Sequence, residues 1–196
     1  MGEEKDMESR TQPMTPEALF YTGLERLFGS QALHSVVNSH PIQSGSSFDT
    51  LIRWLLKVTD ASGADGLSLV AGREAFDLLL RDHGEKIGLQ DTAFRMLPLR
   101  KRAQQGFESL GAWFEAEWGW QCRVASQNET MNFHLQTMDH EDEGFFQRPF
   151  CYFVEGLFQG LLFWVSGGRF FEALTAPTPT DGQLCCEISF SSTPLD

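Results

Sequence analysis

The residue best suited to bind a metal or a ligand is His134, which lies within the alternating segment Met131–Met138. In a strand its side chain projects from the side opposite Phe133 and Leu135. There it could contact a ligand or bind the metal of a tetrapyrrole from the axial position. An exposed histidine, or one satisfied within the core, is the plainer alternative.

A second candidate is Glu155, a single carboxylate inside the apolar stretch Phe150–Val165. A buried carboxylate must find a partner or be protonated. Glu155 could accept a hydrogen bond from a ligand, or pair with Arg148 or Arg169. The helical phase also allows simple exposure at the edge of a dimer.

Gly156 and Gly160 lie four residues apart on the same apolar helix. Small residues at this spacing let another backbone approach closely, which means tight packing or space for a flat ligand. We favour packing.

Motifs of known catalysts are missing from the sequence. The chain has no Gly-x-Gly-x-x-Gly, no phosphate loop, no nucleophile elbow and no His-Glu-x-x-His. It also lacks the nucleotide fingerprint or iron–sulfur cysteine set that a reductase needs. His140 stands among the acids of 139–143, which is more typical of a flexible acidic loop than of a metal site. The sequence therefore favours binding over catalysis.

Helical patterns dominate the first half of the chain, and strand patterns the second. Before residue 119 the spacing predicts helices opened by Thr15-Pro16, by Ser46 or Ser47, by Arg73 and by Pro98. It also predicts a turn over 61–66 and a short buried strand over Leu67–Val70. After Gly119 it predicts the strands Trp120–Ser126, Met131–Met138, Arg169–Thr175 and Gln183–Phe190, with a helix over Pro149–Ser166. This order predicts an α+β fold: a helical N-terminal half, then an antiparallel sheet with a packed Gly-spaced helix.

Charge narrows the possible partners. Lys and Arg total 15 against 27 Asp and Glu, a net charge of −12 over 196 residues. Such a surface repels phosphates, so we expect no nucleic-acid partner and no anionic membrane partner. The basic cluster Arg95, Arg100, Lys101 and Arg102 is interpreted as a solvated helix face.

Length and targeting signals point to one domain in the cytoplasm. Residues 1–15 are interpreted as a disordered acidic tail, and 16–196 as a single domain. No run of about 18 apolar residues predicts a membrane span, and no signal-peptide core is seen. Four cysteines in such a chain are expected to be reduced, as in the cytosol.

Three segments in order resemble the 4-vinyl-reductase-type, or hydrocarbon-binding, domain family. They are Glu115–Trp120 (EAEWGW), Phe150–Gly168 (FCYFVEGLFQGLLFWVSGG) and Asp181–Phe190 (DGQLCCEISF), within a best-matching part of 97–190. The resemblance implies an α/β plait of the transport-particle subunit type, usually dimeric, that encloses an apolar cavity.

The family resemblance also implies a zinc site, which this chain matches in part. Cys151 and Cys186 stand at two of the expected positions, and Glu172 is a third candidate ligand, followed by Thr175 where a cysteine is expected. Zinc needs about four ligands, and Cys185 points to the other side of its strand. We therefore expect no metal, and interpret Cys151 and Cys186 as buried apolar residues.

The cavity that the resemblance implies lies between the sheet and its covering helices. Apolar residues lining it, with two polar groups, are expected to be Trp113, Trp118, Phe133, His134, Phe153, Glu155, Leu157 and Trp164. The resemblance favours a non-catalytic protein that binds or carries an apolar molecule, with a tetrapyrrole or its precursor as one candidate, in chlorophyll synthesis or photosynthetic-complex assembly. A tetrapyrrole vinyl reductase, and a ligand-free interaction or assembly factor within a larger complex, are the alternatives.

Overall fold

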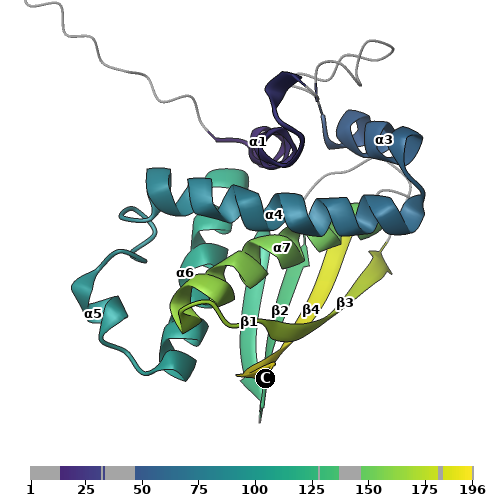
Figure 1. The fold of residues 1–196 in the computed structure, drawn as a ribbon. Coiled ribbons are helices and arrows are strands. Elements are labelled where there is room, and N and C mark those ends of the chain that lie inside the picture. The colour runs from purple at the N-terminus through teal and green to yellow at the C-terminus, as the bar shows by residue number, and fades with distance from the viewer. Residues whose placement is uncertain are drawn as a thin grey trace, which may run out of the picture.

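The computed structural model describes residues 14–31, 33, 47–127, 129–136, 147–180 and 183–195. Helices cover a four-stranded antiparallel sheet, which confirms the predicted α+β class (Figure 1). The predicted tail lies outside the described residues except for Met14 and Thr15. Among the described helices, none is long and apolar enough to cross a membrane.

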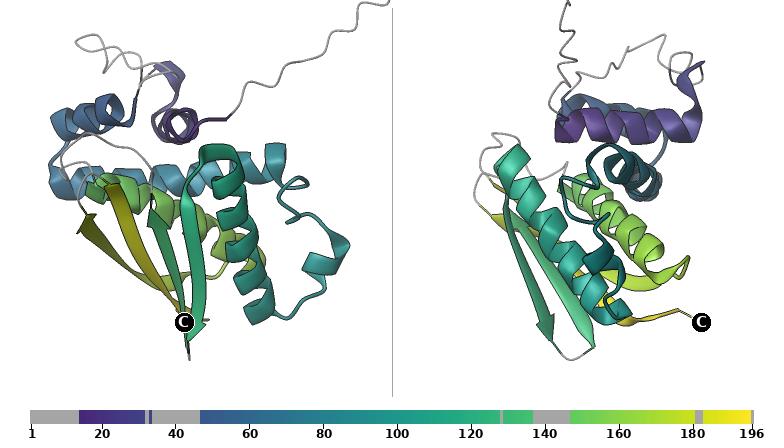
Figure 2. Two further views of the ribbon diagram at one scale, coloured as in Figure 1. Left: turned by 180° about the vertical axis from the view of Figure 1, so that it is seen from behind. Right: turned by 90° about the vertical axis from the view of Figure 1, so that its left-hand side faces the viewer.

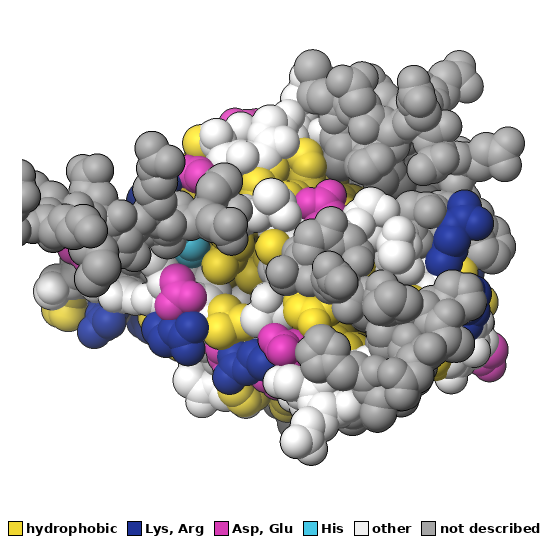
Figure 3. Space-filling model, turned by 90° about the horizontal axis from the view of Figure 1, so that it is seen from above, with side chains coloured by type: hydrophobic (Ala, Val, Ile, Leu, Met, Phe, Trp, Pro, Cys, Tyr) yellow, Lys and Arg dark blue, Asp and Glu magenta, His cyan; other side chains and the backbone are white. Residues whose placement is uncertain are grey.

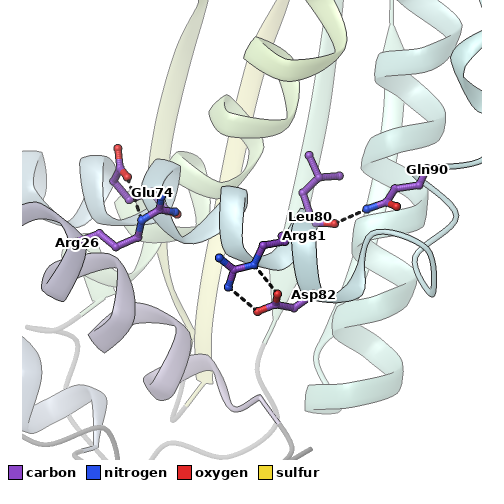
Figure 4. A network of polar contacts seen from close by, with 6 residues as sticks. All are labelled: Arg26, Glu74, Leu80, Arg81, Asp82 and Gln90. Carbon is purple, nitrogen blue, oxygen red and sulfur yellow. Dashed lines mark hydrogen bonds and ion pairs between the residues drawn. The ribbon is translucent and has the colours of Figure 1, made fainter.

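Three helices of the N-terminal half begin at a capping side chain. They are α1 (Pro16–Phe28), α3 (Phe48–Val58) and α4 (Ala61–His83), capped by Thr15, Ser47 and Asp60. Each capping oxygen accepts a hydrogen bond from a backbone N–H of the first turn, which would otherwise lack a partner. At the surface Arg26 of α1 donates to the backbone carbonyl of Glu74 at 3.1 Å and pairs with its carboxylate at 3.6 Å, which ties α1 to α4 (Figure 4).

Helix α4 replaces the turn over 61–66 and the strand over Leu67–Val70, so both of these predictions are wrong. Asp60 caps the helix, with its carboxylate accepting from the Gly63 N–H at 2.7 Å. One face is lined by small buried residues, among them Ala64, Ser68, Ala71, Gly72 and Ala75. Because glycine and serine weaken helix propensity, the pattern resembles a turn until another helix packs on it.

The remaining elements follow the predicted order. After α5 (Thr92–Arg95) come α6 (Leu99–Trp118), β1 (Gln121–Gln127), β2 (Thr130–Gln136), α7 (Gln147–Ser166), β3 (Phe171–Thr180) and β4 (Gln183–Pro194). Helix α6 stops at the predicted Gly119, whose φ of 69° suits glycine. Strand β3 extends through 176–180, beyond the predicted strand end at Thr175. Prolines are tolerated there because β3 is an edge strand.

The sheet has the order β1-β2-β4-β3, and all its pairings are antiparallel. One face carries the apolar residues and meets α6 and α7, while α4 crosses over α7 and α1 lies outermost (Figure 2). Residues along one side of α7 are buried: Cys151, Val154, Phe158, Leu162 and Val165. Seen from above, acidic and basic side chains are interspersed over the described surface (Figure 3).

Helices α4 and α7 touch through their backbones at Gly72 and Gly156. A Cβ built on either glycine would lie 2.9 Å from the Cα of the other and still nearer to a backbone carbonyl oxygen across the interface. Gly160, one turn further along α7, faces the Cβ of Phe76 in the same way. The small-residue spacing on α7 therefore serves packing, as predicted.

This contact predicts that Gly156→Ala lowers the free energy of unfolding by about 3 kcal/mol, because the new methyl group meets rigid backbone. Gly66→Ala is the matched control in α4: no atom lies within 4 Å of its built Cβ, so alanine should stabilise by about 0.5–1 kcal/mol. Urea unfolding of both variants measures the difference. Equal effects would contradict a backbone contact between α4 and α7.

Candidate functional site

The predicted cavity residues are mostly parts of a packed core. Trp113, Phe133, Phe153 and Leu157 are at most 5% exposed. Phe133 lies 4.2 Å from Phe158 between ring centroids, and Trp113 lies 4.9 Å from Trp118. Phe153 packs against Phe20 and Phe48 under α1 and α3, and Phe48 is linked through Phe150 to Trp120. These side chains are therefore packed against neighbouring rings.

An aromatic cluster fills the space between α6, α7 and the sheet. Its rings, with centroid separations between 4.2 and 6.3 Å, belong to Phe107, Phe114, Phe133, Phe158, Phe190, Trp118 and Trp120. Rings at such separations are in van der Waals contact, as in the close-packed interior of most proteins. We call this group the aromatic core.

His134 lies on the other face of the sheet, as its alternation with Phe133 predicted. It stands in register with Arg123 on β1 and Glu187 on β4, and no described helix covers this face. The structure therefore separates His134 from the other seven predicted cavity residues.

Glu155 is buried, but its partners differ from those predicted. The Thr175 hydroxyl donates to one carboxylate oxygen at 2.6 Å, and the Gln159 side-chain amide donates to the other. Arg73 of α4 donates to the Gln159 carbonyl oxygen and interacts electrostatically with Glu155. Arg148 instead pairs with Asp65 at 3.0 Å.

Burial raises the pKa of the Glu155 carboxyl, against the opposing effects of the Thr175 and Gln159 hydrogen bonds and the Arg73 charge. Because the pKa is higher in the folded state, the folded chain holds this proton to higher pH than the unfolded chain. Stability contributed by Glu155 is therefore greatest below the unfolded pKa and falls as pH rises toward the folded pKa.

Glu155→Gln should remove this pH dependence. As pH rises from about 4 to 7, the unfolding free energy of the native chain should fall relative to that of the variant. Glu172→Gln is the control, since Glu172 lies exposed on the neighbouring strand. Denaturant unfolding across this pH range tests it, and parallel curves for all three proteins would contradict the assignment.

Cys151 and Cys186 form a disulfide between α7 and β4, with Cα atoms 5.5 Å apart. The expectation of four reduced cysteines is therefore wrong for this pair, and neither thiol can bind zinc. Glu172 is exposed on β3, and no group of three or more metal-binding side chains occurs within the described parts of the chain. The sequence placed both cysteines in the core correctly but offered no signal that they pair.

The disulfide closes a loop with a sequence separation of 35 residues. Such a link should contribute about 3–4 kcal/mol to stability by restricting the unfolded chain. We expect reductant, or the double change Cys151→Ala and Cys186→Ala, to lower the urea midpoint, and thiol titration of the unfolded native chain to give two thiols. Cys122→Ala, outside the disulfide, is the control. Four thiols, or no response to reductant, would contradict the pairing.

A pocket of about 400 Å³ opens where α5, the start of α6 and the end of α7 meet. Its lining residues are Phe94, Arg95, Arg102, Trp164 and Val165. Trp164 is thus the predicted cavity residue that lines this pocket. The basic cluster is also less uniform than predicted, because Arg102 is half-buried and donates to the carbonyls of Leu97 and Val165 at 3.0 and 3.2 Å.

No known protein family and no curated protein matches the chain by sequence. Solved structures do match. An H-NOX domain described as "Cs H-NOX" has a TM-score of 0.59 at 12% identity, covering 91% of this chain and 95% of that one. An oxygen-binding H-NOX domain related to soluble guanylate cyclases has a TM-score of 0.55 at 12% identity, covering 93% and 96%. An H-NOX protein from K. algicida has 13% identity and a TM-score of 0.56, covering 89% and 96%.

These matches correct the predicted family. The relationship to 4-vinyl-reductase-type domains is wrong, and the chlorophyll-synthesis and vinyl-reductase expectations that rested on it fall with it. The three quoted segments mark a helix, a hairpin, a Gly-spaced helix and a second hairpin, an order that is not specific to one family. Over about nine-tenths of its length, the chain has the fold of H-NOX domains.

Proposed function

We propose that this chain is a non-catalytic small-molecule-binding module that uses the H-NOX fold without a resident haem. The observation that carries the proposal is the aromatic core, which occupies the space between α6, α7 and the sheet with the chain's own side chains. The pocket between α5, α6 and α7 is then the ligand site.

Haem is the group to test. The solved structures that match this fold include an oxygen-binding H-NOX domain and one described by the effect of porphyrin distortion on haem redox potential. Haem iron needs an axial ligand such as His, a Cys thiolate, Tyr or Met. Two histidines are described. His134 lies on β2 and faces away from the aromatic core, and His83, in the last turn of α4, has its ring 5.5 Å from that of Trp113.

Cys122, Tyr21 and Met131 represent the other ligand types among the described side chains, and they fit haem no better. Burial, then the nearby Glu115 charge, raises the pKa of the Cys122 thiol to about 12, so it is not a thiolate at neutral pH. Burial also raises the pKa of Tyr21, which keeps it a phenol. Met131 is buried on β2 beside Phe190, but a methionine usually ligates haem together with a histidine.

The described core also has no space for a flat macrocycle. Phe158, on α7, contacts Phe107 of α6, Phe133 of β2 and Phe190 of β4, so one ring bridges the helices and the sheet. Inserting haem would separate these contacts and the α4–α7 contact behind them. Among the described residues, none joins an axial ligand to room for haem, so we assign the binding role to the pocket between α5, α6 and α7.

The test is expression with added haem precursor, beside the T. tengcongensis H-NOX domain as positive control. We expect less than about 0.1 haem per chain after purification, measured by pyridine haemochrome and the Soret band. His83→Ala and His134→Ala variants, prepared in parallel, identify the ligand of any haem that binds. One haem per native chain would overturn the proposal, whichever residue binds the iron.

A further inference from the structure

Building on the proposed function, we infer that the pocket between α5, α6 and α7 binds a small organic carboxylate with a planar apolar body. The pocket joins an aromatic wall to two guanidinium groups, and both parts are needed to select this class. Its volume of about 400 Å³ lies within the usual range for small-molecule sites.

Phe94 and Trp164 supply the aromatic wall. Their rings are nearly parallel, with an interplanar angle of 9° and centroids 5.9 Å apart. Phe94 is 1% exposed, so its position is set by the core, whereas Trp164 is only partly buried. A planar apolar group placed against this wall would cover the part of Trp164 that is exposed to water, with Phe94 supporting the indole ring from the core.

Arg102 supplies a fixed positive charge. Its guanidinium donates to the Leu97 carbonyl through Nε and Nη2, and to the Val165 carbonyl through Nη1. These bonds hold three of its five N–H groups and leave two for a ligand. Both acceptors are neutral, and none of the five described lining residues is a carboxylate, so the charge of Arg102 is oriented but has no acidic partner among them.

Arg95 supplies a second, adjustable charge. Its side chain is exposed at the end of α5, and it has no ion pair within the described ranges. Two guanidinium groups facing one cavity repel each other, and a carboxylate between them would relieve this repulsion. Inorganic phosphate would also neutralise them, but it would leave the aromatic wall exposed.

Titration calorimetry of the full chain with 2-naphthoate tests the assignment, against 2-naphthalenemethanol as its neutral analogue and inorganic phosphate as an anion without an apolar body. We expect 2-naphthoate to bind at least tenfold more tightly than either. Arg95→Gln should weaken 2-naphthoate binding about fivefold, and Trp164→Leu about tenfold. Lys101→Gln removes the same charge from the exposed side of α6 and should change binding less than twofold.

Three results would overturn this inference. They are no binding of 2-naphthoate at 1 mM, phosphate binding as tightly as 2-naphthoate, and equal weakening by Arg95→Gln and Lys101→Gln. Thermal melts of the variants show whether each is folded, and Arg95→Gln should melt with the native chain because Arg95 is exposed. Each result leaves the haem measurement unaffected, whereas stoichiometric haem would overturn the proposed function whatever the pocket binds.

Discussion

The contact between the backbones of α4 and α7 is the constraint on which the rest of the structure depends. It requires glycine at 72 and 156, since a Cβ at either position would meet backbone atoms of the other helix. Gly23 extends the same principle to α1, because a Cβ there would meet the backbone of Ala71. The helical layers therefore lie close together, and α7 is pressed between α4 and the sheet. Phe158 of α7 points toward α6 and the strands and joins the aromatic core, whereas Phe153 packs against Phe20 and Phe48 under α1 and α3.

In this arrangement the polar and charged side chains that contact α7 lie at its ends and along its edge. Glu155, Gln159 and Thr175 satisfy one another beside Arg73 where α4, α7 and β3 meet. At the C-terminal end of α7, Arg102 bonds the Val165 carbonyl and borders an open pocket. The disulfide at the opposite end ties α7 to β4. A helix held at both ends and along its length suits a rigid support for a peripheral ligand better than an enclosure that opens around a large cofactor.

Much of this architecture could be predicted from the sequence, for physical reasons that are easy to state. Alternation in 131–136 marks a half-buried strand, and the apolar phase of α7 marks its inward face. The first part of helix α4 was missed because its glycine and serine residues have weak helix propensity. Packing against α7 stabilises the helix there, and local propensity gives no information about that contact. Arg73 was missed as the neighbour of Glu155 for the same reason: the two lie 82 positions apart in sequence. Trp113, Phe133, Phe153 and Leu157, which the sequence predicted to line a cavity, are buried in the packed interior, because the count of aromatic residues cannot distinguish a lined pocket from a packed core.

The central claim is that α4 and α7 stay in backbone contact and the core stays closed. The most direct measurement is the nuclear Overhauser effect between the Hα atoms of Gly72 and Gly156, in protein labelled with ¹³C at glycine. We expect a strong cross-peak that is unchanged by excess haemin. Absence of the cross-peak would contradict the backbone contact, and its loss when haemin is added would contradict the closed core.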